Sequence, residues 1–213
     1  YDNNNIKLKL TRSRTLRVGY LSQDWRNHPM GRLTMRLVTG HSSNKINTHL
    51  ISYGARDNSI VRRYVERNAD NFYDILDMTI DEDAVRFIAK LDLDILVDIT
   101  SHTYRGRIAI AAHKPTPIVI NYLGYPGTSG CDGFDYTAVD TKSAPPEIAP
   151  SEFLEKVIYL PGIYQANFMP PTVAPCLLSD RRLCRNRMVP DYVPPYLPSS
   201  SSTSIYASKV RGM

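Results

Sequence analysis

Residues 81–99 read DEDAVRFIAKLDLDILVDI, and this stretch decides the predicted fold. Asp81–Lys90 is predicted to form an amphipathic helix, because its apolar side chains share one helical face. Those side chains belong to Ala84, Val85, Ile88 and Leu91. Leu93–Ile99 follows at once and has the apolar character of a buried strand. A helix followed so closely by a buried strand is typical of a βαβ unit, which predicts a parallel sheet.

The same alternation of strands and helices extends along the chain on both sides of this stretch. Strands are predicted at Leu16–Ser22, His49–Tyr53, Phe72–Ile75, Ile118–Tyr122 and Asp135–Val139. Helices are predicted at Pro29–Thr39, from Asn58 as the capping residue to Asn68, and at Arg105–Ala112. We therefore expect an α/β fold with a Rossmann-like parallel sheet, whose first and fourth strands lie side by side. Ligands of such sheets bind beyond the carboxyl ends of the strands.

The formal net charge of +5 invites a nucleic-acid role, but the basic residues lie at the two ends of the chain. Residues 1–17 hold five basic residues and one acidic residue, and residues 174–213 hold six basic and two acidic ones. Residues 18–173 hold 15 basic against 18 acidic residues. This distribution argues against a nucleic-acid partner.

Three regions follow from these patterns: a basic leader (1–15), a Rossmann-like lobe (16–173) and a tail (174–213). The tail holds five prolines and no sustained periodicity, so we expect it to be disordered or non-native. No apolar run approaches the roughly 20 residues that span a bilayer, so we expect no membrane partner. The three cysteines suggest neither a metal site nor a disulfide framework, and an intracellular setting fits best.

The loop after the first predicted strand reads QDWRNHPMG over residues 23–31. Pro29 suits the first position of a helix, which places Asn27 or His28 at the helix N-terminus. The positive end of the helix disfavours a protonated imidazole, so His28 is a candidate to accept a proton. The alternative is that His28 only caps the helix or lies on the surface.

Two further loops should meet the first one at the same sheet edge, because each follows a parallel strand. Residues 100–107, TSHTYRGR, suggest an anion site at a helix N-terminus, or ordinary capping by Ser101 or Thr103. Residues 123–130, LGYPGTSG, require special backbone geometry, for a ligand or for a tight turn.

Motifs of several other chemistries are missing. The first strand is not followed by the glycine pattern of a dinucleotide site, and no P-loop or G-x-S-x-G elbow occurs. Asp98 lies near the end of a predicted strand, where it either orients a histidine or forms a structural pair.

Several blocks in this order and spacing resemble the catalytic region of nucleocytoplasmic protein O-GlcNAc transferases. They are Arg17–Pro29, Asp94–Thr103, Lys114–Asn121, Leu123–Gly130 and Asp135–Asp140. The resemblance covers about residues 16–170, and LGYPGTSG together with NHP is its most specific part. It implies one lobe of a two-lobed GT-B glycosyltransferase, usually preceded by tetratricopeptide repeats.

The family's reaction is transfer of N-acetylglucosamine from UDP-GlcNAc to Ser or Thr hydroxyls of protein acceptors, with inversion and without a metal or other cofactor. The resemblance therefore implies a cytoplasmic or nuclear enzyme. The second lobe, which supplies a lysine and the uridine pocket, should follow at about residue 175, where the tail begins instead. We therefore expect residues 1–213 alone to be inactive.

His28 matches the active-site histidine of the family, and Asn27 and Pro29 lie beside it. The loop at His102 and Thr103 matches one at the same cleft. The segment that lines the donor sugar and the acceptor corresponds here to Leu123, Gly124, Tyr125, Pro126, Gly127 and Thr128. Two departures stand out: Ser101 replaces an expected glycine, and Asn71 stands where animal members have a second histidine near the cleft.

Two alternative functions remain open at this stage. One is a non-catalytic protein-binding domain or pseudoenzyme. The other is a protein O-fucosyltransferase, which ranks lower because such relatives have Asn where Gly127 stands.

Overall fold

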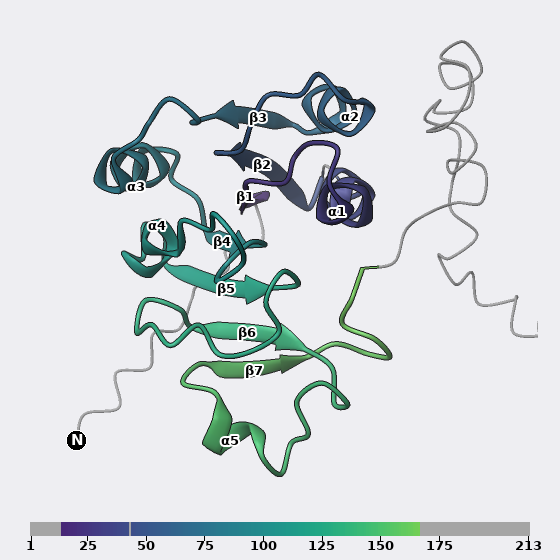
Figure 1. Ribbon diagram of the computed structural model, residues 1–213, viewed down its shortest axis with the longest axis vertical. Coiled ribbons are helices and arrows are strands. Elements are labelled where there is room, and N and C mark those ends of the chain that lie inside the picture. The colour runs from purple at the N-terminus through teal and green to yellow at the C-terminus, as the bar shows by residue number, and fades with distance from the viewer. Residues whose placement is uncertain (1–13, 43, 167–213) are drawn as a thin grey trace, which may run out of the picture. The chain divides into compact units, whose positions relative to one another are not determined.

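The computed structural model describes residues 14–42 and 44–166 (Figure 1). Seven strands form one sheet in the order β3-β2-β1-β4-β5-β6-β7, and every neighbouring pair is parallel. The strands are β1 (Leu16–Ser22), β2 (Ile46–Ser52), β3 (Asn71–Asp74), β4 (Ile95–Asp98), β5 (Ile118–Tyr122), β6 (Tyr136–Val139) and β7 (Lys156–Tyr159). The expected Rossmann-like sheet is confirmed, with β1 beside β4.

Helices cover both faces of the sheet, with α1 and α2 on one side and α3 and α4 on the other (Figure 1). The helices are α1 (Pro29–Thr39), α2 (Ile60–Asn68), α3 (Asp81–Lys90), α4 (Ile108–Ala112) and α5 (Ala149–Glu152). Successive strand residues point to opposite faces, so Tyr20 packs in the cluster under α1 and α2 while Leu21 packs under α3 and α4. Burial on both faces explains why the central strands are apolar without alternation.

Some element boundaries differ from the prediction. Ser59, not Asn58, caps α2, because the Ser59 hydroxyl accepts the Arg62 N–H at 3.1 Å while Asn58 has a φ of 52°. The α4 helix begins at Ile108 rather than Arg105, since Arg105 has a φ of 60° that no right-handed helix contains. The second strand begins at Ile46, three residues earlier than expected.

Two elements were not predicted at all. The α5 helix has only four residues, and β7 is an edge strand whose first and last residues are exposed. Neither has the apolar periodicity from which the other elements were predicted. Among residues 14–42 and 44–166, no helix is long and apolar enough to cross a membrane.

The two end regions lie almost wholly outside this description. Residues 1–13 of the predicted basic leader and the whole predicted tail, 174–213, are outside the described residues. The boundaries at 15 and 173 therefore stay predictions.

Candidate active site

The sheet order brings the three predicted loops to one edge. Parallel pairing aligns the carboxyl ends of β1, β4 and β5, with Leu21 opposite Asp98 and Asp98 opposite Asn121. The chain reverses its direction of winding between β1 and β4, which is the position where α/β sheets bind ligands.

His28 is the residue that caps α1. Its backbone is extended, and its Nδ1 lies 3.3 Å from the Met30 amide nitrogen, which donates to it. The same Nδ1 lies 3.3 Å from Oδ1 of Asp24, and the His28 side chain is 35% exposed. The start of α1 packs tightly on the loop, because a Cβ at Gly31 would lie 2.3 Å from the Asp24 carbonyl oxygen. Only glycine permits this approach.

Asp24 is a buried carboxylate beside this imidazole. Burial raises its pKa, while His28 and Arg26 act in the opposite direction. An Arg26 Nη2 lies 3.3 Å from the same carboxylate oxygen. Asp24 was not predicted from the sequence, and its position four residues before His28 on a tight loop is the signal that could have found it.

Asn27 and Pro29 lie on either side of His28, and their contacts are with other residues of the protein. The Asn27 N–H donates to the Asp57 carboxylate at 2.6 Å, and the Asn27 side-chain oxygen accepts from Arg32 Nε at 3.2 Å. Pro29 occupies the first turn of α1. These contacts fix the loop against the segment that follows β2.

The second loop is organised by Asp98, which is 1% exposed. Its Oδ1 accepts the N–H groups of Thr100 and Ser101 at 2.9 and 3.0 Å. Burial raises the pKa of Asp98 despite these bonds. Asp98 therefore shapes the loop, and the hypothesis that it orients a histidine finds no direct hydrogen bond among the described contacts.

One of the two alternatives for this loop, capping of α4 by Ser101 or Thr103, is not observed. Thr103 Oγ1 donates to the Thr100 carbonyl oxygen at 2.8 Å, and the residue before α4, Arg107, makes no side-chain cap. Arg107 Nε donates to Asp81 at 2.6 Å. Of the two arginines in this loop, Arg107 is thus paired with a carboxylate, while Arg105 lies over the Tyr104 ring.

His102 joins the second loop to the third. Its Nε2 lies 2.6 Å from the carbonyl oxygen of Ser129, and its ring meets that of Tyr125 edge-on at a centroid distance of 5.2 Å. The side chain is exposed. His102 and Tyr125 were both predicted site residues, and the structure brings them together.

Asn121 on β5, which is fully buried, hydrogen-bonds to the backbone of the glycine-rich loop. Its Nδ2 donates to the carbonyl oxygens of Tyr125 and Gly127, at 3.2 and 2.9 Å. A Cβ at Gly124 would lie 2.2 Å from the Ile99 carbonyl oxygen. The need for glycine at 124 thus comes from contact with the protein's own backbone.

The remaining residues of this loop differ in exposure. Pro126 is exposed, and Thr128 Oγ1 donates to the Glu155 carboxylate at 2.9 Å. Leu123, which the resemblance assigns to the site, has its side chain in the hydrophobic core, so contact with a ligand is left to its backbone. Glu155 is a contact that the sequence analysis missed.

Thr100 connects the first two loops. Its Oγ1 lies 3.1 Å from Ser22 Oγ and 3.3 Å from the Gln23 amide nitrogen, which donates to it. The recorded polar contacts of the His28 side chain stay within its own loop and helix. Asn71 lies at the amino end of β3, away from the loop edge, and its amide donates to Asn47 Oδ1 at 2.8 Å.

A seven-stranded parallel sheet with these converging loops defines a Rossmann-like lobe. The sequence model of glycosyl transferase family 41 matches residues 3–168, and the chain belongs to this family.

Two curated relatives and one solved structure illustrate the likeness. A probable UDP-N-acetylglucosamine–peptide N-acetylglucosaminyltransferase (SEC) from Arabidopsis thaliana is 32% identical over 153 residues, which cover 71% of this chain and 15% of the relative. A UDP-N-acetylglucosamine–peptide N-acetylglucosaminyltransferase from Caenorhabditis elegans is 30% identical over 149 residues, covering 70% and 13%. The chain therefore spans less than a fifth of the length of these relatives.

The solved structure is a mutant O-GlcNAc transferase from Thermobaculum terrenum. It superposes with a TM-score of 0.69 at 24% identity, covering 75% of this chain and 30% of that one. This likeness supports the fold of the lobe.

Proposed function

We propose that this chain carries one lobe of a protein O-GlcNAc transferase. The lobe would bind Ser or Thr side chains of protein acceptors and the sugar of UDP-GlcNAc. Support comes from membership of glycosyl transferase family 41 and from relatives whose names specify UDP-N-acetylglucosamine and a peptide acceptor.

The observation that carries the proposal is the geometry of His28. Its partly exposed imidazole lies at the carboxyl end of β1, beside the position where the sheet reverses, with a buried carboxylate 3.3 Å from Nδ1. When Nδ1 bears a hydrogen and donates to Asp24, instead of accepting the Met30 N–H, Nε2 has a lone pair for the proton of an acceptor hydroxyl. A carboxylate that holds one ring nitrogen in this way orients the imidazole.

In this proposal, His28 acts as the base for attack by the acceptor hydroxyl. The acceptor oxygen forms a bond to the anomeric carbon while the bond from that carbon to the UDP phosphate oxygen breaks. The bonding electron pair leaves with the diphosphate, and the hydroxyl proton passes to Nε2 of His28. Attack opposite to the leaving group inverts the anomeric centre. No step needs a metal ion.

The other two loops lie against the substrates in this proposal. His102 and Thr103 flank the donor sugar from the β4 side, and residues 124–128 flank it from the β5 side. The exposed Tyr125 ring beside His102 offers an apolar surface at this position.

The negative charge that develops on the leaving diphosphate needs cations or backbone N–H groups. Arg26 and Arg107 in the described loops are paired with carboxylates, and the exposed Arg105 lies over the Tyr104 ring. We therefore assign most of that task to a second lobe. Residues 1–213 alone would then transfer no sugar, and the complete enzyme would act in the cytoplasm or nucleus.

The test is an exchange of lobes. Residues 16–166 replace the matching segment of the Caenorhabditis elegans relative, and transfer to a peptide is measured with UDP-GlcNAc. We expect transfer of GlcNAc. No transfer by a folded hybrid would favour a non-catalytic binding domain.

A further inference from the structure

Glu155 is a buried carboxylate that belongs to none of the motifs of the site. It precedes β7 and is 6% exposed. Its two oxygens accept hydrogen bonds from Thr128 Oγ1 at 2.9 Å, from the Ser129 N–H at 2.6 Å and from the Ser129 hydroxyl. Among the described residues, no ion pair to Glu155 is found. Its charge is thus balanced by donors of the glycine-rich loop.

Ser129 connects Glu155 to His102, because it makes hydrogen bonds with both residues. The Ser129 N–H and hydroxyl both point to Glu155, while the Ser129 carbonyl oxygen lies 2.6 Å from Nε2 of His102. A carbonyl oxygen only accepts, so Nε2 must bear the hydrogen. The neutral imidazole then has its lone pair at Nδ1.

We propose that Glu155 is the positioning residue that sets the place and the tautomer of His102, acting through Ser129. Glu155 does not touch the substrates, and its effect on the reaction rests on the proposed function of the lobe. The hydrogen bonds that connect Glu155, Ser129 and His102 are present whether or not the lobe transfers a sugar.

The charge of Glu155 is essential to this role, because the hydroxyl of Thr128 has no free lone pair. Thr128 Oγ1 already accepts the N–H groups of Gly130 and Leu154, each at 3.2 Å, while it donates to Glu155. The amide of Glu155→Gln would set an NH₂ group against Thr128 or, after rotation, against the Ser129 N–H. In either placement the NH₂ group, a donor, faces another donor, which is the Thr128 hydroxyl or the Ser129 N–H. One of these buried groups then has no hydrogen-bond acceptor.

The test uses side-chain ¹⁵N NMR of the histidines together with amide hydrogen exchange, both on the full 213-residue chain. In the unsubstituted chain we expect His102 to be the Nε2–H tautomer. Glu155→Gln should change the His102 nitrogen shifts and accelerate exchange at residues 124–130 at least tenfold. The histidine signals of His113 and the exchange of β1 and β4 should stay unchanged.

The matched control is Glu152→Gln, which removes an exposed carboxylate three residues earlier. It should alter neither the His102 signals nor the exchange of the loop. If Glu155→Gln does not fold, Thr128→Val serves as the second variant, with a smaller change in the same signals.

Two results would overturn the proposal. One is a His102 spectrum that is the same in the Glu155→Gln and Glu152→Gln chains. The other is exchange that rises equally in the loop and in β1 and β4, which would make Glu155 a general stabiliser of the fold. Neither measurement needs sugar transfer, so this proposal and the proposed function can fail separately.

Discussion

At the scale of single residues, His28 has two neighbours that compete for one ring nitrogen. The Met30 N–H needs a lone pair on Nδ1, whereas a hydrogen bond to Asp24 needs a hydrogen there. The imidazole therefore cannot cap α1 and present Nε2 as a base at the same moment. Asn, Asp and Ser are the preferred caps, so capping by itself gives no reason for a histidine at this position.

This competition predicts the stability of two His28 variants. His28→Asn supplies a better cap, so its free energy of unfolding should equal or exceed that of the unsubstituted chain. His28→Ala loses the cap and should cost about 1 kcal/mol. Urea unfolding at pH 7 measures both. An Asn variant as unstable as the Ala variant would show that capping is not the structural role of His28.

The buried carboxylate of Asp98 predicts how the stability of the fold depends on pH. Burial raises its pKa in the folded state, so ionisation is disfavoured there relative to the unfolded chain. Asp98→Asn keeps an oxygen to accept from Thr100 and Ser101 but removes the buried charge. The variant should be at least as stable at pH 7, and its advantage should shrink as the pH falls toward the ordinary Asp value of about 4. Urea unfolding between pH 7 and 4 measures this, and an advantage that grows on acidification would contradict it.

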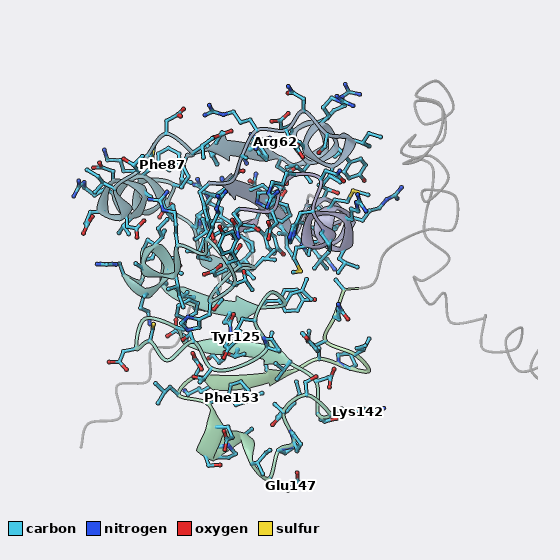
Figure 2. The ribbon with its side chains drawn as sticks, in the orientation of Figure 1. Arg62, Phe87, Tyr125, Lys142, Glu147 and Phe153 are labelled. Carbon is cyan, nitrogen blue, oxygen red and sulfur yellow. The ribbon has the colours of Figure 1, made fainter. Side chains whose placement is uncertain are left out.

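At the scale of elements, a charge network fastens β3 to α2. The side chain of Arg62 extends from α2 toward β3 (Figure 2), with its guanidinium 4.6 Å above the Phe72 ring and 2.5 Å from Asp74. Arg56 reaches the same carboxylate at 2.8 Å. Burial alone would raise the pKa of Asp74, but the hydrogen bonds from Arg56, the Leu76 N–H and Arg62 together lower it to about 2.

The lowered pKa of Asp74 predicts where its contribution appears. A depressed folded-state pKa stabilises the fold above the ordinary value of 3.8, and the contribution is lost as the pH falls to about 2. Asp74→Asn should therefore cost about 2 kcal/mol at pH 7 and little at pH 2. Asp77→Asn is the control, because Asp77 is 81% exposed and should matter little. An equal loss in both variants, or a loss at pH 2 as large as at pH 7, would contradict this reading in acid-dependent unfolding.

Elements with clear apolar periodicity could be predicted from the sequence. The bounds of α1, α3, β1 and β5 agree with the prediction, because each buries a face whose pattern is visible in one dimension. The edge strand β7 was missed because it buries little. Glu155 was missed because nothing in a single sequence signals a carboxylate that meets loop atoms after folding. For Asp24 the only signal was its spacing of four residues from His28. Glu155 and Ser129 are 26 residues apart.

At the scale of the whole molecule, local patterns and the handedness of βαβ units were enough to predict that β1 and β4 are neighbours. That one adjacency brings the loops after β1 and β4 to the same edge. The hydrogen bonds that connect the loops, made by Thr100, His102 and Ser129, could not be predicted from the sequence. These contacts depend on side-chain geometry at the ends of strands.

The most direct test of the account is the loss of sugar transfer when His28 is removed. In the lobe-exchange enzyme, His28→Ala should lower the rate of GlcNAc transfer at least about a hundredfold, in the range of general-base catalysis. The control is His113→Ala, since His113 is exposed at the end of α4 and, among the described residues, its Nδ1 hydrogen-bonds to the Ala109 carbonyl oxygen at 2.7 Å. It should leave the rate unchanged. A His28→Ala enzyme that transfers GlcNAc as fast as the His113→Ala control would contradict the account.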